Sequence, residues 1–259
     1  MSERVVATRL DPQVLEIAID RPEARNAMTF AMYERLAELA RSTKDEIELR
    51  AVVLTGRGGK AFVSGTDIGE FQAFASDDDA LAYEARMAAV GEALESIPVP
   101  AIAAISGSCV GGGFAIAAAC DLRIATAAST FGFPIARGLG NCLSMTTLVS
   151  LVSLIGSART TELIFKARLI EAEEARALGL IHEVVPDEAA LRERTLELAR
   201  TLASYAPLTL RATKEALRRI RQRLVPEGSD LMLMCYGSDD FKEGVAAFLA
   251  KRPARWTGR

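Results

Sequence analysis

The first half of the chain repeats one order of elements, in which an apolar strand is followed by a loop, a helix and another apolar strand. Residues 14–19 (VLEIAI) and 49–54 (LRAVVL) have the composition of buried strands. Pro22 ends the first of them, because proline cannot donate to a central ladder. Two further strands are expected within 97–107 (IPVPAIAAISG) and 121–129 (DLRIATAAS). This alternation predicts an α/β fold with mostly parallel strands.

Helical periodicity marks the segments between these strands and most of the second half. Thr29 is expected to cap an amphipathic helix, and another helix is expected to follow the acidic SDDDA and to end near Ser96. From about residue 144 onward helices dominate, including the long stretch 189–224. Gly179 fits the position that follows a helix C-terminus. We therefore expect a helical region after the α/β part of the chain.

The composition argues against several classes of partner. The formal net charge is -3 and the basic residues are scattered, so nucleic acid is not favoured, and residues 217–224 (LRRIRQRL) are expected to form a helix face. The four cysteines have no CxxC spacing and no neighbouring histidine, so no metal site is expected. Without a signal peptide or an apolar run of about 18 residues, we expect a cytoplasmic protein with no membrane partner.

Two glycine-rich turns each precede an expected helix, at 62–71 (FVSGTDIGEF) and at 109–115 (CVGGGFA). Glycine lets a ligand approach the backbone, and the first amides of a helix have no partner within it. Two such amides that converge on one carbonyl oxygen would form an oxyanion hole. The alternative for a lone GGG is a packing or turn device. A nucleotide site is disfavoured, because neither a GxxxxGK[ST] nor a GxGxxG motif with its downstream acid is present.

Five segments of the chain, in order and at family spacing, resemble the enoyl-CoA hydratase/isomerase (crotonase) superfamily. The resemblance implies a spiral of ββα units over residues 1–195 and a helical region over 196–259 that assembles a homotrimer, often paired into a hexamer. It also implies that the ligand is an acyl-CoA thioester, with no cofactor beyond its coenzyme A portion. The matching segments are RPEARNAM (21–28), GRGGKAFVSGTDIGEF (56–71), AAISGSCVGGGFAIAAACDLRIAT (103–126), EARALGLIHEVV (174–185) and FKEGVAAFLAKRPARWTGR (241–259).

The resemblance also implies roles for particular residues. The backbone amides of Thr66 and Gly112 correspond to the oxyanion hole, and Thr66 stands where the family usually has a small residue such as alanine. The implied coenzyme A contacts are the backbone around Ser64, Asp67 and Ile68 near the adenine, Arg25 near the phosphates, and Lys251 reaching from a neighbouring subunit. The basic residues could equally be solvated charges, and Asp67 could equally be a helix N-cap.

The two glutamates that hydratases of this family use are absent. Ala115 and Ile135 occupy their positions, so water addition by the two-glutamate route is not expected. The protic groups that remain as candidates are Asn141 and Cys142, proposed as catalytic, together with Asp67, Glu70, Tyr83 and Arg137. Each also has an ordinary structural explanation.

The sequence therefore predicts an acyl-CoA enzyme that stabilises a thioester oxyanion or enolate. Its step could be isomerisation, hydrolysis, decarboxylation or C–C cleavage. The alternative is a non-catalytic member that binds acyl-CoA. The single histidine, His182, is expected to have a packing role, and so is Asp121, whose carboxylate can accept from backbone amides.

Overall fold

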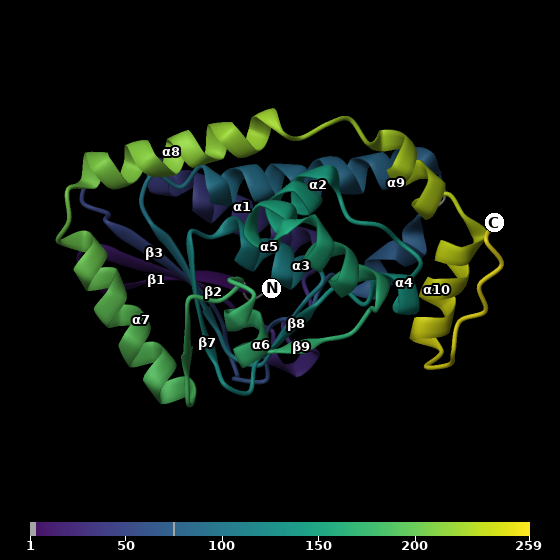
Figure 1. The fold of residues 1–259 in the computed structure, drawn as a ribbon, viewed down its shortest axis with the longest axis horizontal. Coiled ribbons are helices and arrows are strands. Elements are labelled where there is room, and N and C mark those ends of the chain that lie inside the picture. Colours follow the sequence, from purple (N-terminus) through teal and green to yellow (C-terminus); the bar gives the residue numbers. More distant parts are fainter. Residues whose placement is uncertain (1–3, 75) are drawn as a thin grey trace.

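The computed structural model describes residues 4–74 and 76–259 and contains a mixed α/β fold with two sheets (Figure 1). The strands are β1 (Val5–Asp11), β2 (Val14–Ile19), β3 (Ala51–Gly56), β4 (Ala61–Val63), β5 (Ala101–Ile105), β6 (Ser108–Val110), β7 (Leu122–Thr126), β8 (Thr130–Gly132), β9 (Ile170–Glu171) and β10 (Glu183–Val185). The larger sheet has the order β1-β2-β3-β5-β7-β10, and the smaller has the order β4-β6-β8-β9. The pairs β1–β2 and β8–β9 are antiparallel and the other strand pairs are parallel.

Thirteen helical segments accompany these strands in the described residues. The 3-10 segments are η1 (Pro22–Ala24), η2 (Thr43–Asp45) and η3 (Ile68–Ala73). The α-helices are α1 (Phe30–Ser42), α2 (Asp77–Glu95), α3 (Gly112–Ala119), α4 (Ile135–Gly138), α5 (Met145–Phe165), α6 (Ala172–Ala177), α7 (Glu188–Ala203), α8 (Pro207–Arg223), α9 (Ser229–Tyr236) and α10 (Asp239–Leu249). The predicted N-cap is confirmed, since the Thr29 hydroxyl accepts a hydrogen bond from the Met32 amide at 3.3 Å.

The ββα repeat arises because consecutive strands belong to different sheets. β3, β5 and β7 lie in the larger sheet, and β4, β6 and β8, which follow them, lie in the smaller one. A helix then returns the chain to the next repeat, as α2 does after β4 and α3 after β6. The carboxyl ends of the short strands therefore bring the loops at 64–67 and 111–113 together at one edge. The predicted α/β class with a mostly parallel sheet is confirmed.

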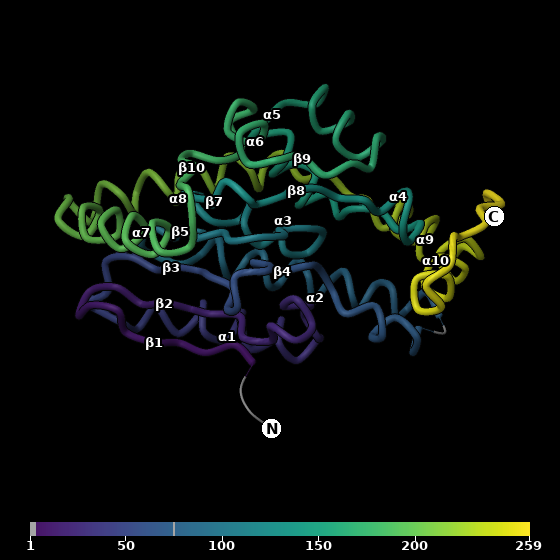
Figure 2. The backbone as a smooth tube through the Cα atoms, turned by 90° about the horizontal axis from the view of Figure 1, so that it is seen from below, coloured from purple at the N-terminus to yellow at the C-terminus, as the bar shows by residue number. Residues whose placement is uncertain are grey.

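The inner strands of the larger sheet, β2, β3, β5 and β7, are buried on both faces, which explains their apolar sequences. Val52 and Leu54 of β3 belong to the main core, beneath α1, α2 and α3. Their neighbour Val53 faces the opposite side, where it packs in a second cluster with Leu191 and Ala199 of α7. Figure 2 shows α7 and α8 at one end of this sheet and α10 at the other end of the molecule.

The last quarter of the chain is helical, as expected, and the boundary expected between residues 195 and 196 lies inside α7. Helix α8 runs along one edge of the molecule (Figure 1), and none of its residues is buried. The ammonium of Lys214 joins α8 to the body, 2.6 Å from the Asp121 carboxylate and 3.1 Å from the Val99 carbonyl. The predicted structural role of Asp121 is also seen, because its carboxylate accepts from the Ala101 amide at 2.8 Å.

Helix α5 is the one described helix whose length and mean hydropathy of 1.4 would allow it to cross a membrane. It is not continuous, because Gly156 interrupts it with φ 75° and ψ 163°. A bilayer requires about 20 residues of unbroken helix, and the two parts of α5 on either side of Gly156 are each much shorter. The apolar sequence of α5 thus forms a kinked pair of helices next to α3.

Candidate active site

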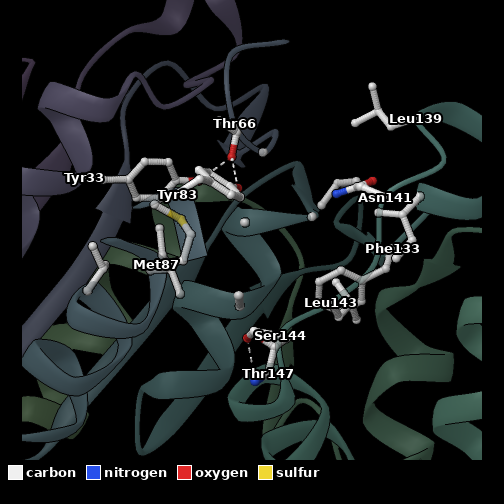
Figure 3. Close-up of a pocket in the computed structure, with 18 of the residues that line it drawn as sticks. Tyr33, Thr66, Tyr83, Met87, Phe133, Leu139, Asn141, Leu143, Ser144 and Thr147 are labelled. Atoms are coloured by element: carbon white, nitrogen blue, oxygen red, sulfur yellow. Dashed lines mark hydrogen bonds between the residues drawn. The ribbon is translucent and has the colours of Figure 1, made fainter. Parts of the chain in front are cut away.

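A cavity of about 580 Å³ lies where the two glycine-rich turns, α2, the start of α5 and the end of α9 meet (Figure 3). Nearly all residues predicted from the sequence as site positions line it. Lys251 does not line the cavity and is exposed on the C-terminal tail, and neither Glu70 nor the exposed Arg137 reaches it. The predicted positions that do line it are Arg25, Ser64, Thr66, Asp67, Ile68, Tyr83, Gly112, Ala115, Ile135, Asn141 and Cys142.

Each glycine of the GGG sequence meets a different steric requirement. Gly111 has a φ of +57°, which favours glycine, and turns the chain into α3. A Cβ at Gly112 would lie 2.2 Å from the Tyr33 hydroxyl oxygen. A Cβ at Gly113 would lie 2.1 Å from the Val63 carbonyl oxygen, because α3 packs directly on β4. The packing explanation of this motif is therefore confirmed, and Gly111 and Gly112 also line the cavity.

The two predicted oxyanion amides lie on adjoining turns. Gly65, which precedes Thr66, has a φ of +108°, and a Cβ there would lie 3.9 Å from the Gly112 nitrogen. The Gly112 amide is at the first position of α3, where a helix provides no acceptor. Met28 pairs with the residues on either side of Thr66, accepting from Asp67 and donating to Gly65. Within residues 4–74 and 76–259, the Thr66 amide has no backbone acceptor.

A cluster of three hydroxyl groups lies beside these amides. The Thr66 hydroxyl oxygen is 3.0 Å from the Tyr33 hydroxyl and 3.1 Å from the Tyr83 hydroxyl. Tyr33 comes from α1 and Tyr83 from α2, so two helices determine the rotamer of Thr66. Figure 3 shows this cluster on one side of the cavity and Asn141 on the other. The cavity wall beside the two predicted oxyanion amides therefore carries hydroxyl groups that can donate hydrogen bonds.

Burial keeps both phenols neutral. It raises the pKa of Tyr33 far above its ordinary value, with Tyr83 adding to the effect and the hydrogen bond to Thr66 opposing it. Burial also raises the pKa of Tyr83 to about 12, again against the hydrogen bond to Thr66. These groups can therefore donate hydrogen bonds at neutral pH but cannot act as phenolate bases.

Asp67 is held in place rather than available for proton transfer. Its carboxylate accepts from Arg21 at 2.7 Å and caps η3 through the Gly69 amide at 3.0 Å. Partial burial opposes ionisation, but the bonds from Arg21 and Gly69 together lower the pKa of Asp67. The alternative role as an N-cap is thus seen, and it leaves the backbone of the 64–68 loop facing the cavity.

Asn141 and Cys142 lie on the wall opposite the hydroxyl cluster. The Asn141 amide nitrogen donates to the Tyr236 hydroxyl at 3.2 Å. The Cys142 sulfur packs 3.2 Å from the Met232 sulfur. Burial, followed by the neighbouring Cys235, raises the pKa of Cys142 to about 12. Cys142 is therefore a thiol at neutral pH and a poor nucleophile, whereas Asn141 can still orient a ligand.

Several cavity residues were missed in the sequence, and helix geometry would have indicated the group on α2. Glu84, Met87, Ala88, Gly91 and Glu95 line the cavity from α2. Their spacing of three and four residues places them on one helix face. Tyr33 and Tyr236 carry no comparable local pattern, because they reach the cavity from α1 and α9, which lie some two hundred residues apart in sequence.

A profile of the family Enoyl-CoA hydratase/isomerase matches residues 10–259. The chain is 33% identical to the short-chain-enoyl-CoA hydratase of Clostridium acetobutylicum, over 93% of this chain and 92% of that protein. It is 32% identical to the crotonyl-CoA hydratase of Syntrophomonas wolfei, over 93% of each.

Solved structures superpose over the whole fold. An enoyl-CoA hydratase/carnithine racemase from Magnetospirillum magneticum aligns with a TM-score of 0.81 and 30% identity, covering 100% of this chain and 97% of that one. A methylmalonyl-CoA decarboxylase in complex with 2-nitronate-propionyl-CoA aligns with a TM-score of 0.89 and 28% identity, covering 99% of both chains. With its two interleaved sheets and its paired glycine turns, the chain belongs to the enoyl-CoA hydratase/isomerase family of the crotonase superfamily.

Proposed function

We propose that this protein is an acyl-CoA enzyme in which the amides of Thr66 and Gly112 bind the thioester oxygen and stabilise an enolate or oxyanion. The observation that supports this most is the meeting of the two glycine turns at one cavity, where neither amide donates to a backbone carbonyl of the residues that the structure describes. Amides of fixed orientation in a site that excludes water stabilise developing negative charge far better than water does.

The coenzyme A portion is proposed to bind along the 64–68 loop, at Ser64, Asp67 and Ile68, with Arg25 near its phosphates. Arg25 has a φ of 51° and lies at the end of η1, so its position is determined by the backbone of the loop. Lys251 is proposed to act from a neighbouring subunit. No other cofactor is proposed, and the protein is expected to be a cytoplasmic trimer or hexamer.

The reaction is proposed to differ from two-glutamate hydration, because Ala115 and Ile135 line the cavity where carboxylates would be needed. Decarboxylation is a specific candidate, since loss of carbon dioxide forms an enolate without a base. The close superposition with a methylmalonyl-CoA decarboxylase favours this candidate. Isomerisation, hydrolysis and C–C cleavage are the other steps compatible with an oxyanion hole.

A pair of variants isolates the Gly112 amide. Gly112→Pro removes the N–H at the first helical position, where proline is favoured. A Cβ at this position would clash with the Tyr33 hydroxyl, so Gly112→Pro and its control Gly112→Ala are both made in the Tyr33→Phe background. Without the hydroxyl, the ring carbon Cζ lies at an ordinary 3.4 Å from that Cβ. Relative to Tyr33→Phe with Gly112→Ala, the proline variant should lose roughly 10²–10³-fold in kcat.

The readout is turnover of a panel of acyl-CoA substrates that includes malonyl-type thioesters, with calorimetry of coenzyme A binding as the folding control. Equal kcat in the two variants would contradict the oxyanion assignment. Binding without turnover of any substrate by the unmodified chain would support the non-catalytic alternative. Crotonyl-CoA hydration with a kcat on the order of 10 s⁻¹ would refute the argument from the missing glutamates.

A further inference from the structure

Three carboxylates line the cavity, and two of them are already engaged. Asp67 is bound by Arg21 and by the Gly69 amide. Glu95 lies 3.4 Å from the Arg221 guanidinium at the far end of α2 and is buried. Glu84 is the third, and within residues 4–74 and 76–259 no side chain or amide pairs with it. It is therefore the carboxylate of this cavity that is free to exchange a proton.

Helix geometry directs Glu84 into the cavity. Glu84, Met87, Ala88 and Gly91 follow one another at three- and four-residue steps on α2, and all of them line the cavity. Tyr83, the preceding residue, contacts Thr66 at the oxyanion turn. Tyr83 and Glu84 both line the cavity, and Glu84 lies close enough to Tyr83, Cys142 and Tyr236 for its charge to act on all three.

The surroundings of Glu84 are short of positive charge. Burial raises the pKa of Glu84 to about 6. The groups on which the charge of Glu84 acts are the neutral hydroxyls of Tyr83 and Tyr236 and the Cys142 thiol. Helix α3 packs against α2 and carries no titratable residue. The other titratable groups packed against α2 include Tyr33 and Glu34 of α1 and Cys235 of α9, and Glu34 pairs with Arg86. Helix α8 contributes Lys214, Arg218 and Arg221, whose charges act on Glu95 at the far end of α2. A base with a pKa close to the working pH is the most effective one for proton transfer.

We propose that Glu84 is the acid–base residue of this cavity, replacing the two absent glutamates with a single carboxylate on α2. This inference rests on the proposed function, because it needs the enolate oxygen to be held by Thr66 and Gly112. The Glu84 carboxylate takes a proton from the carbon next to the thioester carbonyl, and the C–H electron pair becomes the enolate double bond. The carbonyl π pair moves onto the oxygen that the two amides hold. The protonated Glu84 then returns that proton to the same carbon or, where the acyl chain carries a β,γ double bond, to the γ-carbon of the dienolate.

The test is exchange of the α-protons of butyryl-CoA with deuterium oxide, followed by mass spectrometry. The variants are Glu84→Gln, which keeps the shape, Glu84→Asp, which keeps the acid, and Glu92→Gln as an exposed control on the same helix. Glu84→Gln should lower the exchange rate by about 10²-fold or more. Glu84→Asp should retain measurable exchange, and Glu92→Gln should leave the rate unchanged.

The pH profile separates a chemical role from a structural one. In the unmodified protein, exchange should rise with pH through about 6, where Glu84 loses its proton, and this limb should vanish in Glu84→Gln. Calorimetry with butyryl-CoA checks that each variant still binds. Exchange that persists in Glu84→Gln, or no exchange in the unmodified protein, would overturn the inference. The proposed function is tested separately from Glu84. Its tests are the decarboxylation of a malonyl-type thioester, which needs no base, and the Gly112 variants.

Discussion

At the scale of single residues, the backbone and the side chain of Thr66 have separate roles. Its amide is the proposed donor to the thioester oxygen, and its hydroxyl joins two tyrosines from different helices. The sequence indicated the amide, because any residue except proline has one. It did not indicate the hydroxyl contacts, because Tyr33 and Tyr83 lie 33 and 17 residues away along the chain.

Thr66→Val tests the hydroxyl bridge, since valine keeps the shape and removes the polar group. Tyr33 is 1% exposed, so its hydroxyl has no ready access to water when its partner is lost. We expect a loss of about 1–3 kcal/mol in the free energy of unfolding, measured by urea denaturation. Thr66→Ser keeps the hydroxyl and should lose much less. A valine variant as stable as the serine variant would contradict the bridge.

His182 lies outside the cavity, where its Nδ1 accepts from the Arg123 amide at 3.2 Å. Burial, with the charge of Arg123 adding to it, lowers the pKa of His182 below 6.5. The neutral ring is thus favoured in the folded state, and this stabilisation is complete above pH 6.5 and is lost as the pH falls through the folded value.

The prediction from His182 compares the unmodified chain with His182→Asn, which keeps an acceptor at the δ position and does not titrate. Between pH 7 and 5, the free energy of unfolding of the unmodified chain should fall more steeply than that of the variant. Parallel pH dependences, measured by chemical denaturation, would show that His182 is not buried in its neutral form.

At the scale of elements, the long apolar strands were predictable and the short ones were not. The predicted strand at 14–19 matches β2, and the one at 49–54 matches β3 with a shift of two residues. β4, β6, β8 and β9 are only two or three residues long. Their strand character comes from pairing with one another in the smaller sheet, so no periodicity within them could identify them.

The kink in α5 gives a prediction at this scale. With φ 75° and ψ 163°, Gly156 adopts a backbone conformation that is nearly exclusive to glycine. Gly156→Ala would place its Cβ in open space, so the cost is purely one of backbone strain, about 1–3 kcal/mol. Gly91→Ala in α2 also meets nothing within 4 Å but is helical, and it should stabilise by roughly 0.5–1 kcal/mol. Urea denaturation of both variants should show opposite signs.

At the scale of the whole molecule, α8 is attached by its charged side and exposes its apolar side. Lys214 and Arg221 reach the body at Asp121 and Glu95. Leu217, Ile220 and Leu224, on one face at helical spacing, are more than half exposed. An apolar stripe of this kind is the usual mark of a protein–protein contact, which supports the proposed trimer or hexamer.

The assembly prediction follows from this stripe. Light scattering of the intact chain should give three or six times 27.8 kDa. Replacing Leu217 and Ile220 together by glutamate should lower that mass, because charge would be buried at a subunit contact. Ile47→Glu, at an isolated residue 90% exposed, serves as the control and should leave the mass unchanged. A mass of 27.8 kDa for the unmodified chain would refute the assembly.

The sequence by itself determined the family, the α/β class and the two glycine-rich turns, and it predicted that Ala115 and Ile135 replace the hydratase glutamates. Each of these depends on residue type at a local position: glycine where the backbone must turn, and apolar runs where strands are buried. Only the tertiary structure decided which side chains surround those amides. Tyr33, Tyr83, Glu84 and Tyr236 meet in the cavity because packing of α1, α2 and α9 brings distant segments together. Burial then sets their protonation, since the cost of a charge depends on its surroundings rather than on its neighbours along the chain.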